Sequence, residues 1–132
     1  HRDLRRQRQM CIRDRPAAAQ GAIAIQVRSG DDARSLAVAA ACAALNCADS
    51  AAEVTAERAL LGHLDGSCHT PIAASAHMGD DGRLSISATI LSPDGSAALS
   101  ADAEAPADAA EQLGRDLAAE LLEAAGGRDF LA

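Results

Sequence analysis

A cysteine in a loop of small residues is the strongest candidate for chemistry in this sequence. Cys68 lies in the segment 65–72, between the end of a predicted helix and the start of a predicted strand. The adjacent imidazole of His69 favours the thiolate, which is the nucleophilic form of cysteine. A solitary Cys-His pair is weak evidence, however, so spacing alone favours a half-buried cysteine without a role.

A metal site is the second chemistry to weigh. The side chains available for it are His63, Cys68, His69 and His77. The sequence has neither a Cys-x-x-Cys nor a His-x-x-x-His pair, and zinc sites normally contain such local pairs. We therefore expect no metal.

Two glutamates with helical spacing form a third candidate. Glu53 and Glu57 lie four residues apart beside Arg58, so they can be imagined as an acid and a base. An exposed helix face with a local ion pair is the commoner explanation of this pattern, and we expect it here.

Length and composition exclude several classes of function. The chain has 132 residues, which is one domain or part of one, and its formal charge is −7. It has a single Phe and neither Trp nor Tyr, which excludes an aromatic platform for nucleic acid, and the acidity argues against a phosphate-binding surface. The longest apolar run, Leu36–Leu45, is far shorter than the roughly 20 residues that cross a bilayer. We expect neither nucleic acid nor membrane as a partner.

The first half of the chain predicts one strand and two helices. Ile23, Ile25 and Val27 alternate within 22–28, which is typical of a strand. An Ala-rich helix is predicted over 33–45, after turn residues that can also cap it. A second helix is predicted from Ser50, whose capping box includes Glu53, to about residue 64, with Gly66 as its left-handed end.

The second half predicts a small α+β domain. Strands are expected over 71–77, 83–91 and 97–103, separated by two Gly-containing turns, and a helix is expected over 107–124 with an apolar stripe. The fold class is therefore α+β, a three-stranded antiparallel sheet with helices on one face. The strand and helix of 16–45 precede it as an orphan segment, because a lone strand needs partners that this chain does not supply.

The basic start of the chain has a different origin. Residues 1–15 hold six Arg and two Asp, and Arg5 to Asp14 resemble the translation of a transposase sequencing adapter. We interpret 1–15 as a non-native, adapter-derived segment and exclude it from fold reasoning. Without it the chain has 6 Arg against 17 acidic residues, a formal charge of −11.

Five segments of the chain occur in the order of the motifs of one known family. The loop Gly66–Ala73 is similar to a Gly-Gly-Cys-Gln-Val-Pro-Ile-Gly motif, and Pro16–Ile25 is similar to a Pro-Ala-Val-Gly-Gln-Gly-Ala-x-Ala-Ile motif. The other matching segments are Thr55–Ala59 before the Cys loop, Ser92–Ser96 in a hairpin turn, and Leu113–Leu122 in the last helix. Together they resemble the hydroxymethylbilane synthase (porphobilinogen deaminase) family.

This resemblance implies the last third of a three-domain transferase of tetrapyrrole biosynthesis. Residues 16–45 would complete the first domain, and 46–132 would form the C-terminal domain, whose Cys68 holds a dipyrromethane cofactor by a thioether. The family joins four porphobilinogen molecules, with loss of ammonia, into hydroxymethylbilane. Gln20 and Gly21 match positions that line its active-site cleft.

Other implications concern the protein as a whole. The resemblance implies a cytoplasmic protein that is monomeric at full length. It also implies that the catalytic groups and the substrate-binding arginines lie outside this chain, so the chain alone is expected to be inactive.

Departures from the family motifs leave an alternative open. Ala19 replaces a Gly, and Ser67, His69 and Thr70 replace common residues of the Cys loop. The cysteine itself is retained, which favours cofactor attachment. The alternative is a standalone α+β binding or interaction domain that has kept the fold without catalysis.

Overall fold

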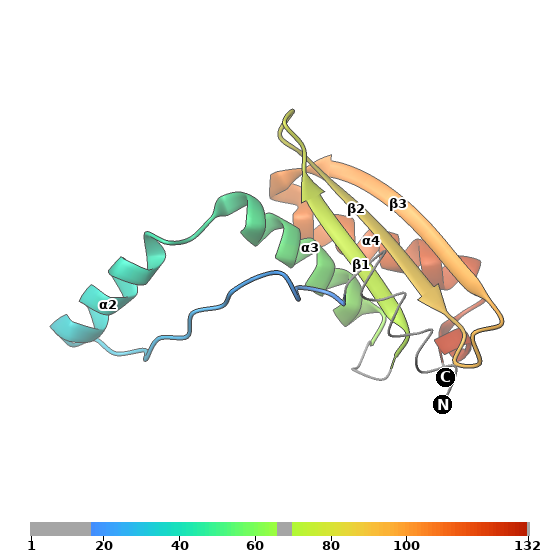
Figure 1. Cartoon of the computed structure of the whole chain (residues 1–132), viewed down its shortest axis with the longest axis horizontal. Coiled ribbons are helices and arrows are strands. Elements are labelled where there is room, and N and C mark those ends of the chain that lie inside the picture. Colours follow the sequence, from blue (N-terminus) through green and yellow to red (C-terminus); the bar gives the residue numbers. More distant parts are fainter. Residues whose placement is uncertain (1–16, 66–69, 132) are drawn as a thin grey trace.

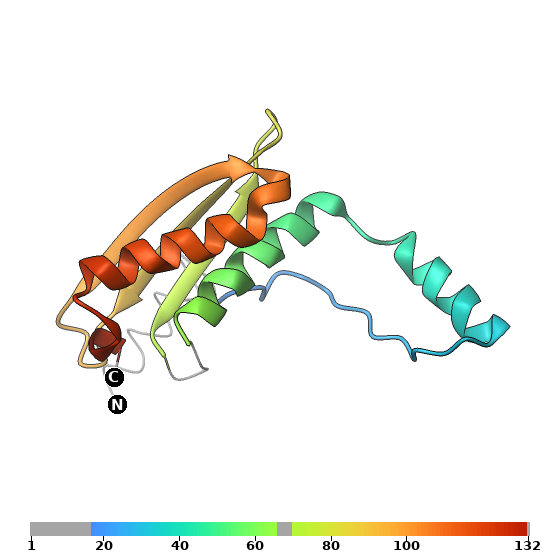
Figure 2. The same cartoon turned by 180° about the vertical axis from the view of Figure 1, so that it is seen from behind.

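Two helices cover one face of a three-stranded antiparallel sheet (Figures 1 and 2). The computed structural model describes residues 17–65 and 70–131. Its strands follow one another across the sheet as β1 (Ile72–Met78), β2 (Arg83–Leu91) and β3 (Ala98–Pro106). The covering helices are α3 (Ala48–His63) and α4 (Ala110–Ala124). The predicted α+β class and its meander are confirmed.

Alternation in β2 determines which face of the sheet is buried. Leu84, Ile86 and Ile90 are at most 1% exposed and belong to the core that α3 and α4 complete. The serines between them are only partly buried. Both hairpin turns end on a glycine with positive φ, 76° at Gly82 and 71° at Gly95, a conformation that glycine adopts without a steric penalty.

The two helices pack closely because small residues face each other at their contact. The core between helices and sheet contains Leu60 of α3 with Leu117 and Leu121 of α4, each at most 1% exposed. A Cβ atom on Gly114 would lie 2.1 Å from the carbonyl oxygen of Ala56. Glycine at this position therefore sets the distance between the helices.

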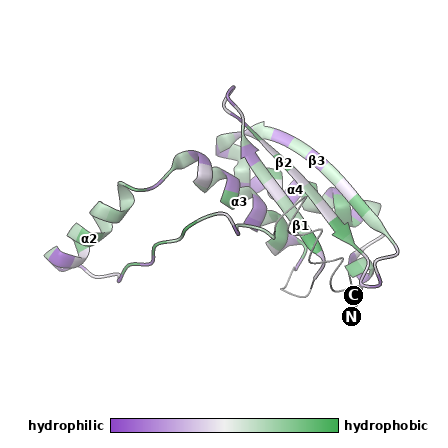
Figure 3. Cartoon of the chain, viewed as in Figure 1, coloured by the Kyte–Doolittle hydropathy of each residue, from purple (hydrophilic) through white to green (hydrophobic). Residues whose placement is uncertain are grey.

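The segment before α3 extends away from this domain (Figure 1). Helix α2 (Ala33–Ala43) has no buried residue, and Figure 3 colours most of it as hydrophobic. Residues 22–30 form no regular structure, so the strand predicted over 22–28 is not formed within the part of the chain that the structure describes. No described strand pairs with this segment, and its alternating apolar residues are exposed.

Some predicted helix ends differ from the observed ones. Helix α3 begins at Ala48 with Cys47 as its N-cap, so the capping box from Ser50 is wrong. Asp65 has a left-handed φ of 52° after this helix, and Gly66, the predicted left-handed end, lies outside the described residues. The last predicted helix is divided into a 3-10 turn, Ala107–Ala109, and α4.

No single helix of the ranges 17–65 and 70–131 is long and apolar enough to cross a membrane. Helices α2 and α3 meet the criterion of length and composition only together, and they are bent by 91° at the break between them.

Candidate functional site

The loop that carries Cys68 is bounded by two residues of the core. Cys68 and His69 fall in 66–69, outside the described residues. On one side of that gap Leu64, after α3, is 3% exposed, and on the other side Ile72, the first residue of β1, is 7% exposed. Core packing therefore fixes Leu64 and Ile72, which precede and follow Cys68 in the sequence.

An arginine from the end of the chain binds the residue that follows Leu64. The guanidinium group of Arg128 donates to the carboxylate of Asp65, and its Nη2 donates to the carbonyl oxygen of His63 at 2.9 Å. Asp65 has the left-handed conformation that Asp tolerates better than most residues. Arg128 thus joins the C-terminal 3-10 turn (Arg128–Leu131) to the start of the loop.

Gln20 and Gly21 lie in an exposed turn. The N–H of Gln20 donates to the carbonyl oxygen of Ala17 at 3.2 Å, and the N–H of Ala22 donates to that of Ala19 at 3.3 Å. Ala19 has φ of 61°, in the left-handed region that glycine occupies freely. This is the position at which the similar family motif has Gly, so the departure noted in the sequence falls on a conformationally demanding residue.

A glutamate of α3 joins this turn to the sheet. Glu57 is 9% exposed; its Oε2 accepts from the N–H of Ala19 at 2.6 Å, and its Oε1 accepts from the N–H of Ala76 at 2.8 Å. Glu53 accepts from the N–H of Met78 at 2.9 Å. The expectation of an exposed helix face with a local ion pair is therefore wrong, because these carboxylates satisfy backbone donors of β1 and of the turn.

The two candidate metal ligands that the structure describes, His63 and His77, lie apart. His63 lies at the end of α3, whereas His77 lies at the far end of β1, where its Nδ1 is 3.7 Å from Oε1 of Glu53. Within the described ranges no three His, Cys, Asp or Glu side chains are placed to hold a metal ion. Cys68 and His69 lie outside those ranges.

The two described cysteines, Cys42 and Cys47, differ in exposure. Cys47 is exposed at the start of α3, and the backbone N–H and hydroxyl of Ser50 lower the pKa of its thiol. Cys42 is partly buried on α2. Cys47 is therefore the thiol against which selective chemistry at Cys68 must be compared.

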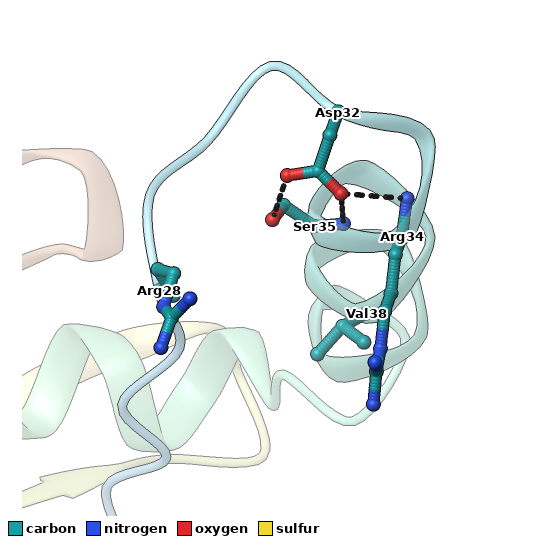
Figure 4. A pocket seen from close by; sticks show the side chains of 5 residues that line it. All are labelled: Arg28, Asp32, Arg34, Ser35 and Val38. Carbon is teal, nitrogen blue, oxygen red and sulfur yellow. Dashed lines mark hydrogen bonds between the residues drawn. The ribbon is translucent and has the colours of Figure 1, made fainter.

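A hollow at the start of α2 holds two arginines (Figure 4). Arg28 and Arg34 line it, but Oδ1 of Asp32 accepts hydrogen bonds from the backbone N–H groups of Arg34 and Ser35, at 3.1 and 3.0 Å. A hydrogen bond from the Ser35 hydroxyl, at 2.5 Å, lowers the pKa of this carboxyl. The protein's own carboxylate thus occupies the anion-binding end of the helix, as the predicted cap requires.

Sequence reasoning missed the contacts of Glu57 and Arg128. The spacing of Glu53 and Glu57 placed both side chains on one helix face, but it contained no sign that this face lies against an edge strand. Arg128 is 63 residues from Asp65, so no local pattern connects them.

Comparison with known proteins identifies the family. The family model described as "Porphobilinogen deaminase, C-terminal domain" matches residues 51–123. A porphobilinogen deaminase of Thermus thermophilus is 44% identical over 118 residues, covering 89% of this chain and 37% of the relative. One of Paracoccus denitrificans is 49% identical over 106 residues, covering 80% of this chain and 32% of the relative.

These alignments extend beyond the C-terminal domain. A match over 89% of a 132-residue chain necessarily includes most of residues 17–45, so the extended segment and α2 share the likeness. The chain spans about a third of the length of the curated relatives it matches. On the family model and these identities together, the chain belongs to the porphobilinogen deaminase family.

Proposed function

We propose that this chain is the C-terminal third of a porphobilinogen deaminase, in which Cys68 holds the dipyrromethane cofactor. The observation that carries the proposal is the family match over an α+β domain in which Cys68 falls between α3 and β1 in the sequence. In the complete protein the activity would be the joining of four porphobilinogen molecules into hydroxymethylbilane, with release of ammonia.

The exposed apolar residues of 17–45 support an association with another domain of the same polypeptide. Ile23 is 94% exposed, Ile25 is 55% exposed and Leu36 is 58% exposed. Burying such a side chain stabilises a structure by roughly 1.5–3 kcal/mol. An open groove of ≈ 840 Å³ also lies between the extended segment, α2 and the start of α3. We propose that residues 16–45 complete the first domain, while 46–132 form the cofactor-attachment domain.

The residues present suit a covalently held pyrrole group. A soft thiolate captures an electrophilic methylene carbon, so Cys68 supplies the chemistry that a thioether needs. The dipyrromethane, when bound, supplies the pyrrole end onto which substrate units are joined. This chain would hold the dipyrromethane on the segment that follows Asp65, a residue that Arg128 binds. It would also provide Gln20 and Gly21 as part of the wall of the active-site cleft.

A chimeric protein tests this proposal. Residues 17–132 would replace the matching C-terminal part of the Thermus thermophilus relative. Intact-mass spectrometry and porphobilinogen consumption would then be measured for the chimera and for its Cys68→Ala and Cys47→Ser variants. We expect a dipyrrole adduct and turnover in the parent chimera and in Cys47→Ser, and neither in Cys68→Ala.

Two results would contradict the proposal. A folded parent chimera without an adduct would favour the alternative, a binding domain that has kept the fold without catalysis. An adduct that persists in Cys68→Ala and disappears in Cys47→Ser would show that the cofactor is attached to Cys47 instead of Cys68. The 132-residue chain alone is expected to consume no porphobilinogen.

A further inference from the structure

Glu57 makes two hydrogen bonds that connect three separate parts of the chain. It lies on α3, its Oε1 accepts from β1 at Ala76, and its Oε2 accepts from the turn at Ala19. The side chain is among the few polar groups in the described core, at 9% exposure. A carboxylate buried to this degree needs such donors, because burial without them is costly.

The bond to β1 has a structural explanation that the bond to the turn lacks. β1 is an edge strand, so its outward N–H groups have no neighbouring strand. Glu53 and Glu57 accept from two of them, at Met78 and Ala76, because a four-residue step on a helix (about 6 Å) nearly equals a two-residue step on a strand (about 6.8 Å). Capping of this edge uses one oxygen of each glutamate and leaves Oε2 of Glu57 unexplained.

That second oxygen determines where the turn lies. Ala19 directs its N–H at Glu57 from a left-handed conformation that costs free energy for any residue with a Cβ. The next two residues are Gln20 and Gly21, which the turn's own hydrogen bonds keep in register with Ala19. Beyond the turn, residues 22–30 are exposed or nearly so and form no regular structure. The bond from Ala19 is thus the direct polar link between the turn and α3.

We infer that Glu57 is a positioning residue, whose carboxylate holds the Gln20–Gly21 turn at a fixed place beside the cofactor-attachment domain. This inference rests on the proposed function for its catalytic consequence, but the contact itself does not depend on it. Glu57 would act through the turn, without touching substrate.

Glu57→Gln and Glu53→Gln form a matched pair for the test. Glutamine has one acceptor oxygen and an NH₂ donor, so at residue 57 it accepts from one N–H and turns a donor toward the other. At residue 53 it can still accept the backbone hydrogen bond from the N–H of Met78. Both variants remove one charge and change side-chain volume little.

The measurements are amide hydrogen exchange in the 132-residue chain and kinetics in the chimera. In Glu57→Gln we expect Ala19 exchange to accelerate, and kcat to fall, each roughly tenfold, the change that corresponds to about 1.4 kcal/mol. KM should change little, because the cleft wall is displaced while the substrate carboxylates keep their partners elsewhere. Glu53→Gln should change neither quantity.

Several results would overturn the inference. One is an Ala19 N–H that, in the parent chain, exchanges as fast as an unprotected amide. This measurement does not require Glu57→Gln to fold. Another is an equal fall of kcat in both variants, which would assign the effect to edge capping. An inactive parent chimera would instead contradict the proposed function and leave the exchange result to decide the contact.

Discussion

The contact between α3 and α4 predicts that Gly114→Ala destabilises the domain. A Cβ at residue 114 would lie 2.1 Å from the backbone oxygen of Ala56 and 3.0 Å from Cβ of Ala59. Ordinary van der Waals contact begins at 3.4 Å, so the helices must separate by about 1.3 Å at this point. Neither neighbour can move aside as the end of a flexible side chain does, because one is backbone and the other is a Cβ.

The expected loss follows from two opposing effects. Overpacking of this kind costs about 1–3 kcal/mol, and separation of the helices also loosens Leu60 against Leu117. Alanine is favoured over glycine within a helix by about 1 kcal/mol, which offsets part of the cost. Because the steric term involves backbone, we expect a net loss of about 2 kcal/mol in the free energy of unfolding, or about 8–16 °C in Tm for a domain of this size.

Gly62→Ala is the matched control, and thermal unfolding followed by circular dichroism is the assay. Gly62 also lies within a helix, α3, but a Cβ there would meet nothing within 4 Å. It should therefore raise the stability, by about 0.5–1 kcal/mol. If Gly114→Ala proved as stable as Gly62→Ala, the close approach of the helices would be refuted as a constraint.

Three further predictions concern the turns and the N-terminal segment. Ala19→Gly should relieve the left-handed strain and slow amide exchange at residue 19, roughly threefold; faster exchange would contradict this. Hydrogen bonds from the Ser92 hydroxyl and from Ser96 lower the pKa of Asp94 from 3.8 to about 2, so its contribution to stability is present above pH 4 and is lost as the pH falls toward 2. The Asp94→Ala variant should therefore lose less stability than the parent chain over that pH range. Equal losses in the two proteins, or an Asp94 carboxyl that titrates near 4 by NMR, would rule the prediction out. A chain that starts at Cys47 should unfold cooperatively with a Tm within about 8 °C of the parent's, because α2 has no buried residue and loss of the hydrogen bond from Ala19 to Glu57 costs about 1 kcal/mol; loss of the transition would count against an independent domain.

Local patterns were enough to predict the sheet and the last helix. The alternation of β2 and the Gly-containing turns predicted the two hairpins that the structure forms, in which Ile86 lies opposite Ala76 on one side and Ala103 on the other. Leu113, Leu117 and Leu121 are buried on α4, as their helical spacing predicts. In both cases the signal and the structure lie within the same short segment.

Sequence patterns whose structure depends on a distant part of the molecule predicted less. The alternating Ile23, Ile25 and Val27 mark an apolar face, but strand pairing also requires a neighbour, and none lies among the residues described. The capping box from Ser50 competed with an earlier start, where Ala48 and Asp49 suit the first turn of a helix. For the cofactor site, the spacing of Cys68 alone favoured a cysteine without a role, and the family likeness supplied the assignment that remains to be tested.

Capping of β1 by glutamates also bears on how copies of the chain meet. An edge strand can recruit a strand from another molecule and so begin aggregation. Here the N–H groups of Ala76 and Met78 are already bound, so an incoming strand would first have to displace two carboxylates. The opposite edge, β3, carries the exposed acids Asp102 and Glu104; Glu104 is paired with Arg83 of β2, and the charge of Asp102 disfavours a second copy placed alongside. The sheet is thereby protected against growth at both edges, through occupied donors on one side and charge on the other.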